Sequence, residues 1–150
     1  MKFTKLFTAG CLAAVLGAGS LFAQDEPVQV RIRAVTDKDG KGEVIGWSAC
    51  TSHSRRLVFV GVLEVSIYVH PASRRQGIGT LLLDHLVQAS EAAGFWTLQS
   101  SVFPENTASI ALHEAAGFAP IGTRTKVGKM THGPMAGIWR DLLIMERRST

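Results

Sequence analysis

The spacing of hydrophobic positions predicts alternating strands and helices along most of the chain. Apolar and polar residues alternate over 29–35, which is typical of a half-buried strand. A polar, glycine-containing cluster over 37–42 predicts a turn, and extended character resumes over 43–49. The run 57–69 is rich in Val, Leu and Ile, so it predicts one or two buried strands broken near Gly61.

The second half of the chain adds two helices. Apolar residues at helical spacing predict a helix over 78–93, which opens from a turn over 74–79 and ends at Gly94. A turn at 104–106 leads into a shorter helix over 107–116, which ends at Gly117. Strands are predicted over 95–103, 119–127 and 138–145.

This order of elements predicts an α/β fold. After Gly42 it runs strand, strand, helix, strand, helix, strand, strand, which favours a mixed sheet flanked by helices on both faces. Aromatic residues that follow the helices are candidates for its core, namely Phe95, Trp96 and Phe118.

The first 23 residues have the pattern of an exported leader. Lys2 and Lys5 precede an uncharged apolar run that ends at Ala23, before a polar stretch. This pattern is typical of a secretory signal peptide, although a buried N-terminal helix is an alternative. The run is short and broken by glycine, so we expect no membrane span.

Composition indicates one folded domain. A chain of 150 residues with 46% hydrophobic and 19% charged positions is typical of a globular protein. Of its 16 basic residues, Lys2 and Lys5 lie in the leader, which leaves 14 against 12 acidic residues. No basic cluster with interleaved aromatic residues follows, so we expect no nucleic-acid partner.

Cysteine and histidine usage excludes further classes of site. The two cysteines, Cys11 and Cys50, form neither a disulfide framework nor a zinc motif. The five histidines show no ligand spacing with carboxylates or cysteines, so we predict no metal. Cys50 has no recognisable histidine partner, which disfavours a covalent acyl-cysteine route.

The segment RRQGIGT, residues 74–80, is the most informative for chemistry. It lies between a predicted strand and an amphipathic helix, whose N-terminus exposes unpaired backbone N–H groups. Gly77 and Gly79 let the backbone approach a phosphate, and the two arginines add positive charge. The spacing is neither that of a nucleotide P-loop nor that of a dinucleotide fingerprint. Alone, the segment also fits an ordinary glycine turn with surface arginines.

The run VSIYVHPASRRQGIGT, residues 65–80, resembles the acetyl-CoA signature of the GNAT acyltransferases, in which such a turn clamps the CoA pyrophosphate. Further motifs follow in order: EAAGF at 91–95, PENTAS at 104–109, LHEAAGF at 112–118, IG at 121–122 and WRD at 139–141. The series resembles the phosphinothricin acetyltransferase branch of GNAT over about 44–148. It implies the GNAT acyl-CoA N-acyltransferase fold, in a domain over 44–150.

The resemblance implies that acetyl-CoA is the co-substrate and places its binding residues. Backbone groups of Ile67, Tyr68 and Val69 would pair with the pantetheine arm as an added strand does. The pyrophosphate would be held by Arg75, Gln76, Gly77, Ile78, Gly79 and Thr80. Asn106 would bind the pantetheine or acetyl end, and a helix N-cap is an equal and compatible interpretation of this residue.

Glu64 is the candidate catalytic base. A carboxylate in an apolar strand is costly unless it is paired or functional, and an amine attacks a thioester only when unprotonated. The resemblance places the family's glutamate at this position, while an edge-strand surface acid is the alternative. The acceptor side is marked more weakly by His113, Trp139 and Arg140, for which a structural or packing role is the competing interpretation.

The N-terminal part departs from the family pattern. Members of this branch carry two helices between the first two strands, and here only a strand and a polar turn over 24–43 precede the strand at 44. Residues 1–46 instead loosely resemble the exported start of a periplasmic copper-zinc superoxide dismutase, without its His-x-His ligands. We therefore expect a fold that lacks the usual first two helices, with exposed apolar sheet surface that could support a homodimer.

Three functions follow for testing. The first is N-acetyl transfer from acetyl-CoA to the amine of a small amino-acid-like acceptor, of phosphinothricin or methionine sulfoximine type. The second is a CoA-binding remnant without turnover, because the acceptor-site helices are missing. The third, an exported antioxidant protein, is disfavoured by the absent metal ligands. Use of acetyl-CoA implies the cytoplasm, whereas the leader implies export.

Overall fold

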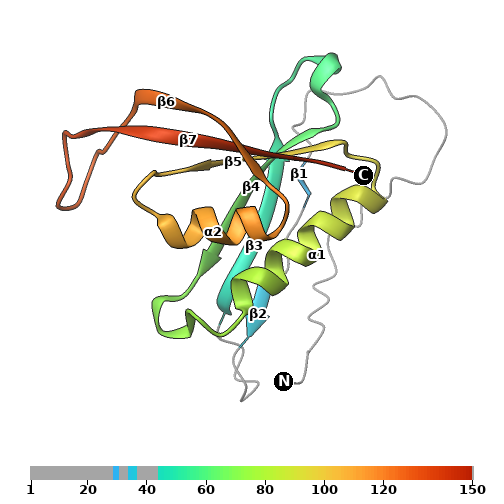
Figure 1. Cartoon of the computed structure of the whole chain (residues 1–150), viewed down its shortest axis with the longest axis horizontal. Coiled ribbons are helices and arrows are strands. Elements are labelled where there is room, and N and C mark those ends of the chain that lie inside the picture. The colour runs from blue at the N-terminus through green and yellow to red at the C-terminus, as the bar shows by residue number, and fades with distance from the viewer. Residues whose placement is uncertain (1–28, 31–33, 37–43, 150) are drawn as a thin grey trace.

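The computed structural model describes residues 29–30, 34–36 and 44–149 (Figure 1). Three predictions fall outside these residues: the leader over 1–23, the turn over 37–42, and the absence of two helices before the strand at 44. The regular elements are β1 (Gln29–Val30), β2 (Ala34–Thr36), β3 (Val44–Ser52), β4 (Val62–Val69), α1 (Ile78–Ala92), β5 (Thr97–Val102), α2 (Thr107–Ala115), β6 (Ala119–Lys129) and β7 (Trp139–Arg148).

The strands form one mixed sheet. Its order is β1-β3-β4-β5-β7-β6, and β2 also pairs with β3. β4 and β5 run parallel, and the other pairings are antiparallel. The predicted order of elements from β3 onward is confirmed. The predicted strand over 29–35 is described only as β1 and β2, because residues 31–33 lie outside the description.

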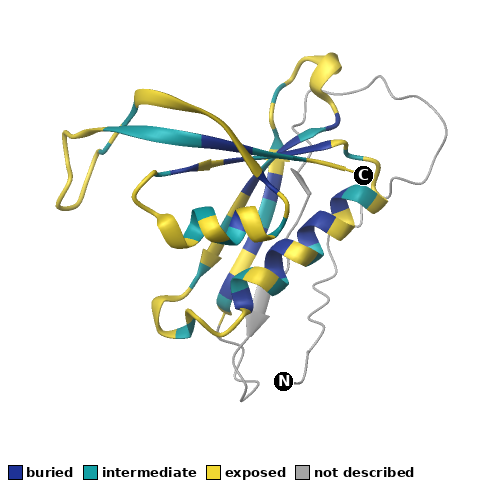
Figure 2. Cartoon of the chain, viewed as in Figure 1, coloured by how far each residue is buried: buried dark blue, intermediate teal, exposed yellow. Residues whose placement is uncertain are grey.

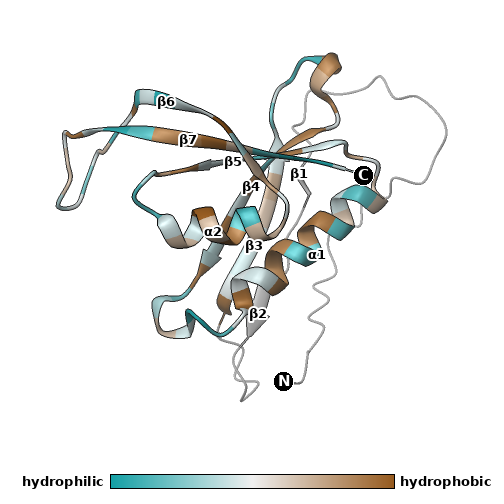
Figure 3. Ribbon diagram, in the orientation of Figure 1, coloured by the Kyte–Doolittle hydropathy of each residue, from teal (hydrophilic) through white to brown (hydrophobic). Residues whose placement is uncertain are grey.

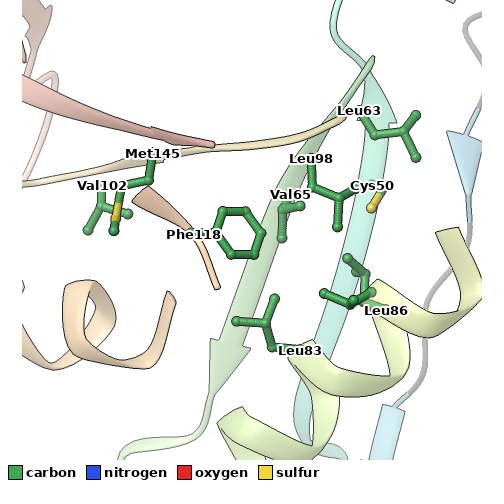
Figure 4. Packing of buried hydrophobic residues seen from close by; sticks show 10 residues of the cluster. Cys50, Leu63, Val65, Leu83, Leu86, Leu98, Val102, Phe118 and Met145 are labelled. Carbon is green, nitrogen blue, oxygen red and sulfur yellow. The ribbon is translucent and has the colours of Figure 1, made fainter. Parts of the chain in front are cut away.

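One face of the sheet carries the core. Along β3, Gly46, Ser48 and Cys50 are buried, whereas Trp47 and Thr51 are exposed, which is the period of two that a one-sided sheet requires (Figure 2). The buried cluster joins strand and helix residues, namely Cys50, Leu63, Val65, Leu83, Leu86, Val87, Leu98, Val102, Phe118 and Met145. Figure 4 shows Leu83 and Leu86 reaching from α1 toward the sheet.

Both described helices pack on this same face. α1 is amphipathic, with its apolar side turned to the sheet (Figure 3), and Leu112 of α2 packs against the same cluster. The prediction of helices on both faces is therefore wrong for the described residues. On the opposite face Trp47 and Tyr68 are opposed in register, stack with ring centroids 6.2 Å apart, and are 37% and 44% exposed.

The apolar run over 57–69 is strand only in its second part. Residues Leu57–Phe59 form an exposed 3-10 turn, and β4 begins at Val62. The backbone N–H groups of Phe59 and Val60 bond to the carbonyls of Arg56 and Leu57, so the turn satisfies them locally. Hydrophobicity alone therefore misassigned this segment, since the turn connects β3 to β4 outside the core.

Two of the three predicted core aromatics are in or against the core. Phe118 is buried and Phe95 packs against the cluster, whereas Trp96 is 43% exposed. Trp96 covers the backbone of Gly61, where an added Cβ would lie 2.1 Å from its Cε3 atom. One side of the indole thus packs on Gly61, just before β4, and the other side is in solvent. For this reason the prediction of Trp96 as a core residue is wrong.

Candidate functional site

A cleft opens where β4 and β5 part. These parallel strands pair from Val62 and Thr97 only as far as Glu64 and Gln99. Beyond Glu64, β4 keeps its antiparallel partner β3, while β5 continues beside β7. The carboxyl ends of parallel strands are where open α/β sheets bind ligands, because the adjoining loops and helix N-termini meet there.

The cleft has a volume of about 1130 Å³, at or above the ~300–1,000 Å³ range of common small-molecule sites. Its walls come from the end of β4, the turn before α1, the start of α1, the segment between β5 and α2, α2 itself and Arg140 of β7. Of the residues predicted to bind the cofactor, those lining the cleft are Ile67, Tyr68, Val69, Arg75, Gly77, Ile78, Gly79, Thr80 and Asn106. Gln76 does not line it.

The N-terminus of α1 is open toward the cleft. Gly77 is its N-cap with a φ of 77°, and no side chain caps the helix there. A Cβ added at Gly77 would meet nothing within 4 Å. The first N–H groups of the helix therefore lack an acceptor within the helix. Arg74 and Arg75 line the cleft beside this helix end. This combination suits an anionic phosphate group.

The N-terminus of α2, by contrast, is capped. The Asn106 Oδ1 atom accepts a hydrogen bond of 3.2 Å from the backbone N–H of Ser109. Asn106 also lines the cleft. The cap interpretation of Asn106 is thus confirmed in the structure, and its place in the lining keeps the ligand interpretation open to test.

Arg140 of β7 forms part of the cleft wall and is held on two sides. Its Nη2 atom donates to Glu105 Oε2 at 2.7 Å, and its guanidinium carbon lies 3.7 Å from the Phe103 ring centroid. The side chain is 13% exposed, and its buried Nε finds no partner among the described residues. The pKa of the Glu105 carboxyl is lowered by its own backbone N–H and by Arg140.

Glu64 does not line the cleft, and it precedes Ile67, the first residue of β4 in the lining, by three positions. It is half-buried on the face of the sheet opposite α1, opposed in register by Thr51 and Gln99. The hydroxyl of Ser101 on β5 donates to Glu64 Oε1 at 3.1 Å. The candidate base thus sits at the last paired position before the strands part.

His113 and Trp139 lie outside the cleft lining. His113 is buried, its Nδ1 lies 2.8 Å from the Ser109 carbonyl oxygen, and its ring meets Phe118 edge to face. Burial lowers the pKa of His113, partly offset by the hydrogen bond to Ser109. Trp139 is 54% exposed, with the Lys129 ammonium 5.7 Å from its ring centroid. Both positions match the structural interpretation better than a ligand contact.

Other chemistries find little support in the described residues. Burial raises the pKa of the Cys50 thiol to about 12, so this thiol stays protonated at neutral pH. No group of three or more His, Cys, Asp or Glu side chains in the described ranges could hold a metal ion. Within those ranges, no helix combines the length and apolar character needed to cross a membrane.

Sequence reasoning missed the three residues that hold Glu64 and Arg140 in place. Ser101 bonds the candidate base, and Phe103 and Glu105 hold Arg140. A signal for Ser101 was present, because alternation places it on the same face of β5 as Gln99, away from the buried Leu98 and Ser100. Nothing local indicates the Glu105–Arg140 pair, since the two residues are 35 positions apart.

Comparison with known proteins agrees with this geometry. The model of the acetyltransferase (GNAT) family matches residues 16–118. An L-methionine sulfoximine/L-methionine sulfone acetyltransferase of Pseudomonas aeruginosa is 32% identical over 72% of this chain, which spans 60% of that relative's length.

Solved structures agree as well. A phosphinothricin acetyltransferase of Sinorhizobium meliloti in complex with acetyl-CoA is 32% identical with a TM-score of 0.69, over 78% of this chain and 60% of that one. A ribosomal-protein-alanine N-acetyltransferase of Brucella melitensis is 30% identical with a TM-score of 0.70, over 79% and 68%. Because the family model matches more than half of this chain, the chain belongs to the acetyltransferase (GNAT) family.

Proposed function

We propose that this chain transfers an acetyl group from acetyl-CoA to the amine of a small amino-acid-like acceptor. The observation that carries the proposal is the cleft between β4 and β5, into which the uncapped N-terminus of α1 opens. A family relative has been solved with acetyl-CoA bound. That structure and the open N-terminus of α1 beside the cleft support acetyl-CoA as the co-substrate.

The chain's own residues would bind the co-substrate in two parts. The first N–H groups of α1, with Arg74 and Arg75, would hold the pyrophosphate. The end of β4 has a strand partner on one side only, so its backbone groups can pair with the amide-bearing pantetheine arm. Asn106 would bind near the reacting end, since it lines the same cleft.

Glu64 would act as the general base. Acetyl-CoA supplies a thioester carbonyl, which the acceptor nitrogen attacks; the N–C bond forms as the C–S bond breaks and CoA leaves as a thiolate. Glu64 would take the proton that the nitrogen loses, directly or through one water molecule. Support for this role comes from its position at the end of the β4–β5 pairing, three residues before the β4 residues that line the cleft.

The acceptor class rests on relatives whose names specify methionine sulfoximine, methionine sulfone and phosphinothricin. All three acceptors are amino acids with a free amine and a carboxylate. Arg140, a cation in the cleft wall, is the candidate partner for such a carboxylate. The name of one solved relative specifies an alanine of a ribosomal protein, so a peptide amine is the alternative acceptor.

A second candidate function is CoA binding without turnover. It is favoured by the exposed face of the sheet, where Trp47 and Tyr68 stack with no described helix above them. An acceptor held on one side only would lose much of the orientation on which the reaction depends. This candidate predicts acetyl-CoA affinity with no acetylated product.

An acceptor panel separates these functions. Purified full chain is incubated with acetyl-CoA and either methionine sulfoximine, phosphinothricin or a peptide with N-terminal alanine, and product is measured by mass spectrometry. Product from the two amino acids and none from the peptide supports the proposal. Calorimetric binding of acetyl-CoA with no product from any acceptor supports the second candidate, and absence of binding contradicts both.

A further inference from the structure

We infer that Ser101 is a positioning residue for the reaction: its hydroxyl holds the Glu64 carboxylate where the pairing of β4 with β5 ends. The inference rests on the proposed function, because it concerns how the proposed base is kept in place. The observation is the hydrogen bond of 3.1 Å from Ser101 Oγ to Glu64 Oε1.

The hydrogen bond spans the place where two strands separate. Backbone pairing of β4 with β5 ends at Glu64 and Gln99, and Ser101 is two residues further along β5. A side-chain bond therefore continues the link between the strands by one step after the backbone pairing stops. It holds Oε1 toward β5, while no described residue donates a hydrogen bond to Oε2, which can accept one from an amine or a water molecule.

Ser101 has no substitute in this role among the described residues. Gln99, the register partner of Glu64, directs its Nε2 to Glu146 Oε1 instead, at 3.4 Å. An ionised carboxylate only accepts hydrogen bonds, so the Ser101 hydroxyl must be the donor. In the described ranges it is the one side-chain donor to Glu64.

Holding the carboxylate matters because glutamate is flexible. A glutamate side chain has several rotatable bonds, and fixing it costs free energy that a prior hydrogen bond offsets. Proton transfer needs the acceptor oxygen within hydrogen-bond reach of the reacting nitrogen. Loss of the Ser101 hydroxyl should thus lower kcat and leave acetyl-CoA binding in the cleft unchanged.

The test uses two substitutions of equal shape. Ser101→Thr keeps the hydroxyl, and Ser101→Val replaces it with a methyl group; both residues are β-branched and suit a strand. Each is made in the full chain with Glu64 and, separately, with Glu64→Gln. We measure kcat and KM with methionine sulfoximine, the Kd of acetyl-CoA, and the melting temperature.

The expected result is a kcat near that of the unchanged chain for Ser101→Thr and one lower by about fivefold for Ser101→Val, the rate equivalent of one modest hydrogen bond. The acetyl-CoA Kd should not change. In the Glu64→Gln background, Ser101→Val should lower the remaining rate no further than Ser101→Thr does, because Ser101 acts through Glu64.

Three results would overturn the inference, each in a different way. Equal kcat for Ser101→Val and Ser101→Thr, in a chain that Glu64→Gln slows, removes the role of Ser101 and leaves the proposed function standing. Absence of acetyl transfer by the unchanged chain removes both. If Ser101→Val lowers both the rate and the melting temperature, with Glu64 and with Glu64→Gln alike, the role of Ser101 is purely structural.

Discussion

Gly79 of α1 lies so close to Leu112 of α2 that a Cβ added at position 79 would be 3.1 Å from the Leu112 Cδ2 atom. The second glycine of the turn motif is therefore where two helices approach each other beside the cleft. Gly77 differs, because it needs its positive φ of 77° and has open space around it.

This contact predicts that Gly79→Val destabilises the fold. A valine there overpacks the α1–α2 contact, at a cost of about 1–3 kcal/mol. Leu112→Ala removes the obstructing side chain, so the double substitution should cost less than the sum of the single ones. Urea unfolding of the four proteins checks this coupling, and strictly additive costs would show that Leu112 is not what limits position 79.

The arginines beside the α1 N-terminus predict a selective loss of affinity. R74Q/R75Q removes two positive charges from the cleft lining, and R55Q/R56Q removes two from the loop before Leu57, outside that lining. We expect R74Q/R75Q to weaken acetyl-CoA binding by about tenfold or more, since hydrogen bonds to charged groups contribute ~1.5–3 kcal/mol each. Calorimetry in low and high salt measures this.

The control pair fixes the interpretation. R55Q/R56Q should bind acetyl-CoA as the unchanged chain does, and R74Q/R75Q should lose part of the salt dependence. Equal weakening by both double substitutions would mean a general charge effect and not a phosphate site at α1.

His113 predicts a pH dependence of stability. Burial lowers its pKa below the ordinary 6.5, so the unfolded chain takes up a proton first as the pH falls. Stability should be unaffected by this group above about pH 6.5 and decrease as the pH drops from there toward the folded-state value. The melting temperature should decrease less steeply between pH 7.5 and 5 in His113→Phe. His132→Gln, at an exposed loop position, should retain the full decrease, and an equal slope in all three proteins would contradict the assignment.

Much of the fold could be predicted because its signals are local. Apolar spacing and Gly94 predict the helix over 78–93, and the end of the predicted helix agrees with the end of α1 to within one residue. The strand prediction for residues 57–60 is wrong for the opposite reason. Their hydrophobic side chains are typical of a strand, yet tertiary packing decides that β4 starts at Val62. Which face a helix covers is set by the order and direction of the strands that the helix connects, and no local pattern encodes these.

At the site, the glycine turn and the end of β4 could be predicted from a contiguous motif, and the structure brings them to one cleft. The partners of Glu64 and Arg140 could not, because Ser101 and Glu105 lie 37 and 35 positions away in the chain. Such pairs depend on where β4, β5 and β7 are placed side by side.

Glu64→Gln tests the central claim most directly. Acetylated methionine sulfoximine is measured over a range of pH for the unchanged chain, for Glu64→Gln and for Glu146→Gln, with the acetyl-CoA Kd determined in the same samples. Glu146 is the matched control, because it is a carboxylate on the same face of the sheet as Glu64 and the two residues flank Gln99 in register. The account predicts a kcat lower by about 10²–10⁴-fold in Glu64→Gln alone, unchanged acetyl-CoA affinity, and a remaining rate that rises with pH as the free amine becomes available. Transfer by Glu64→Gln as fast as by the unchanged chain near neutral pH would contradict it.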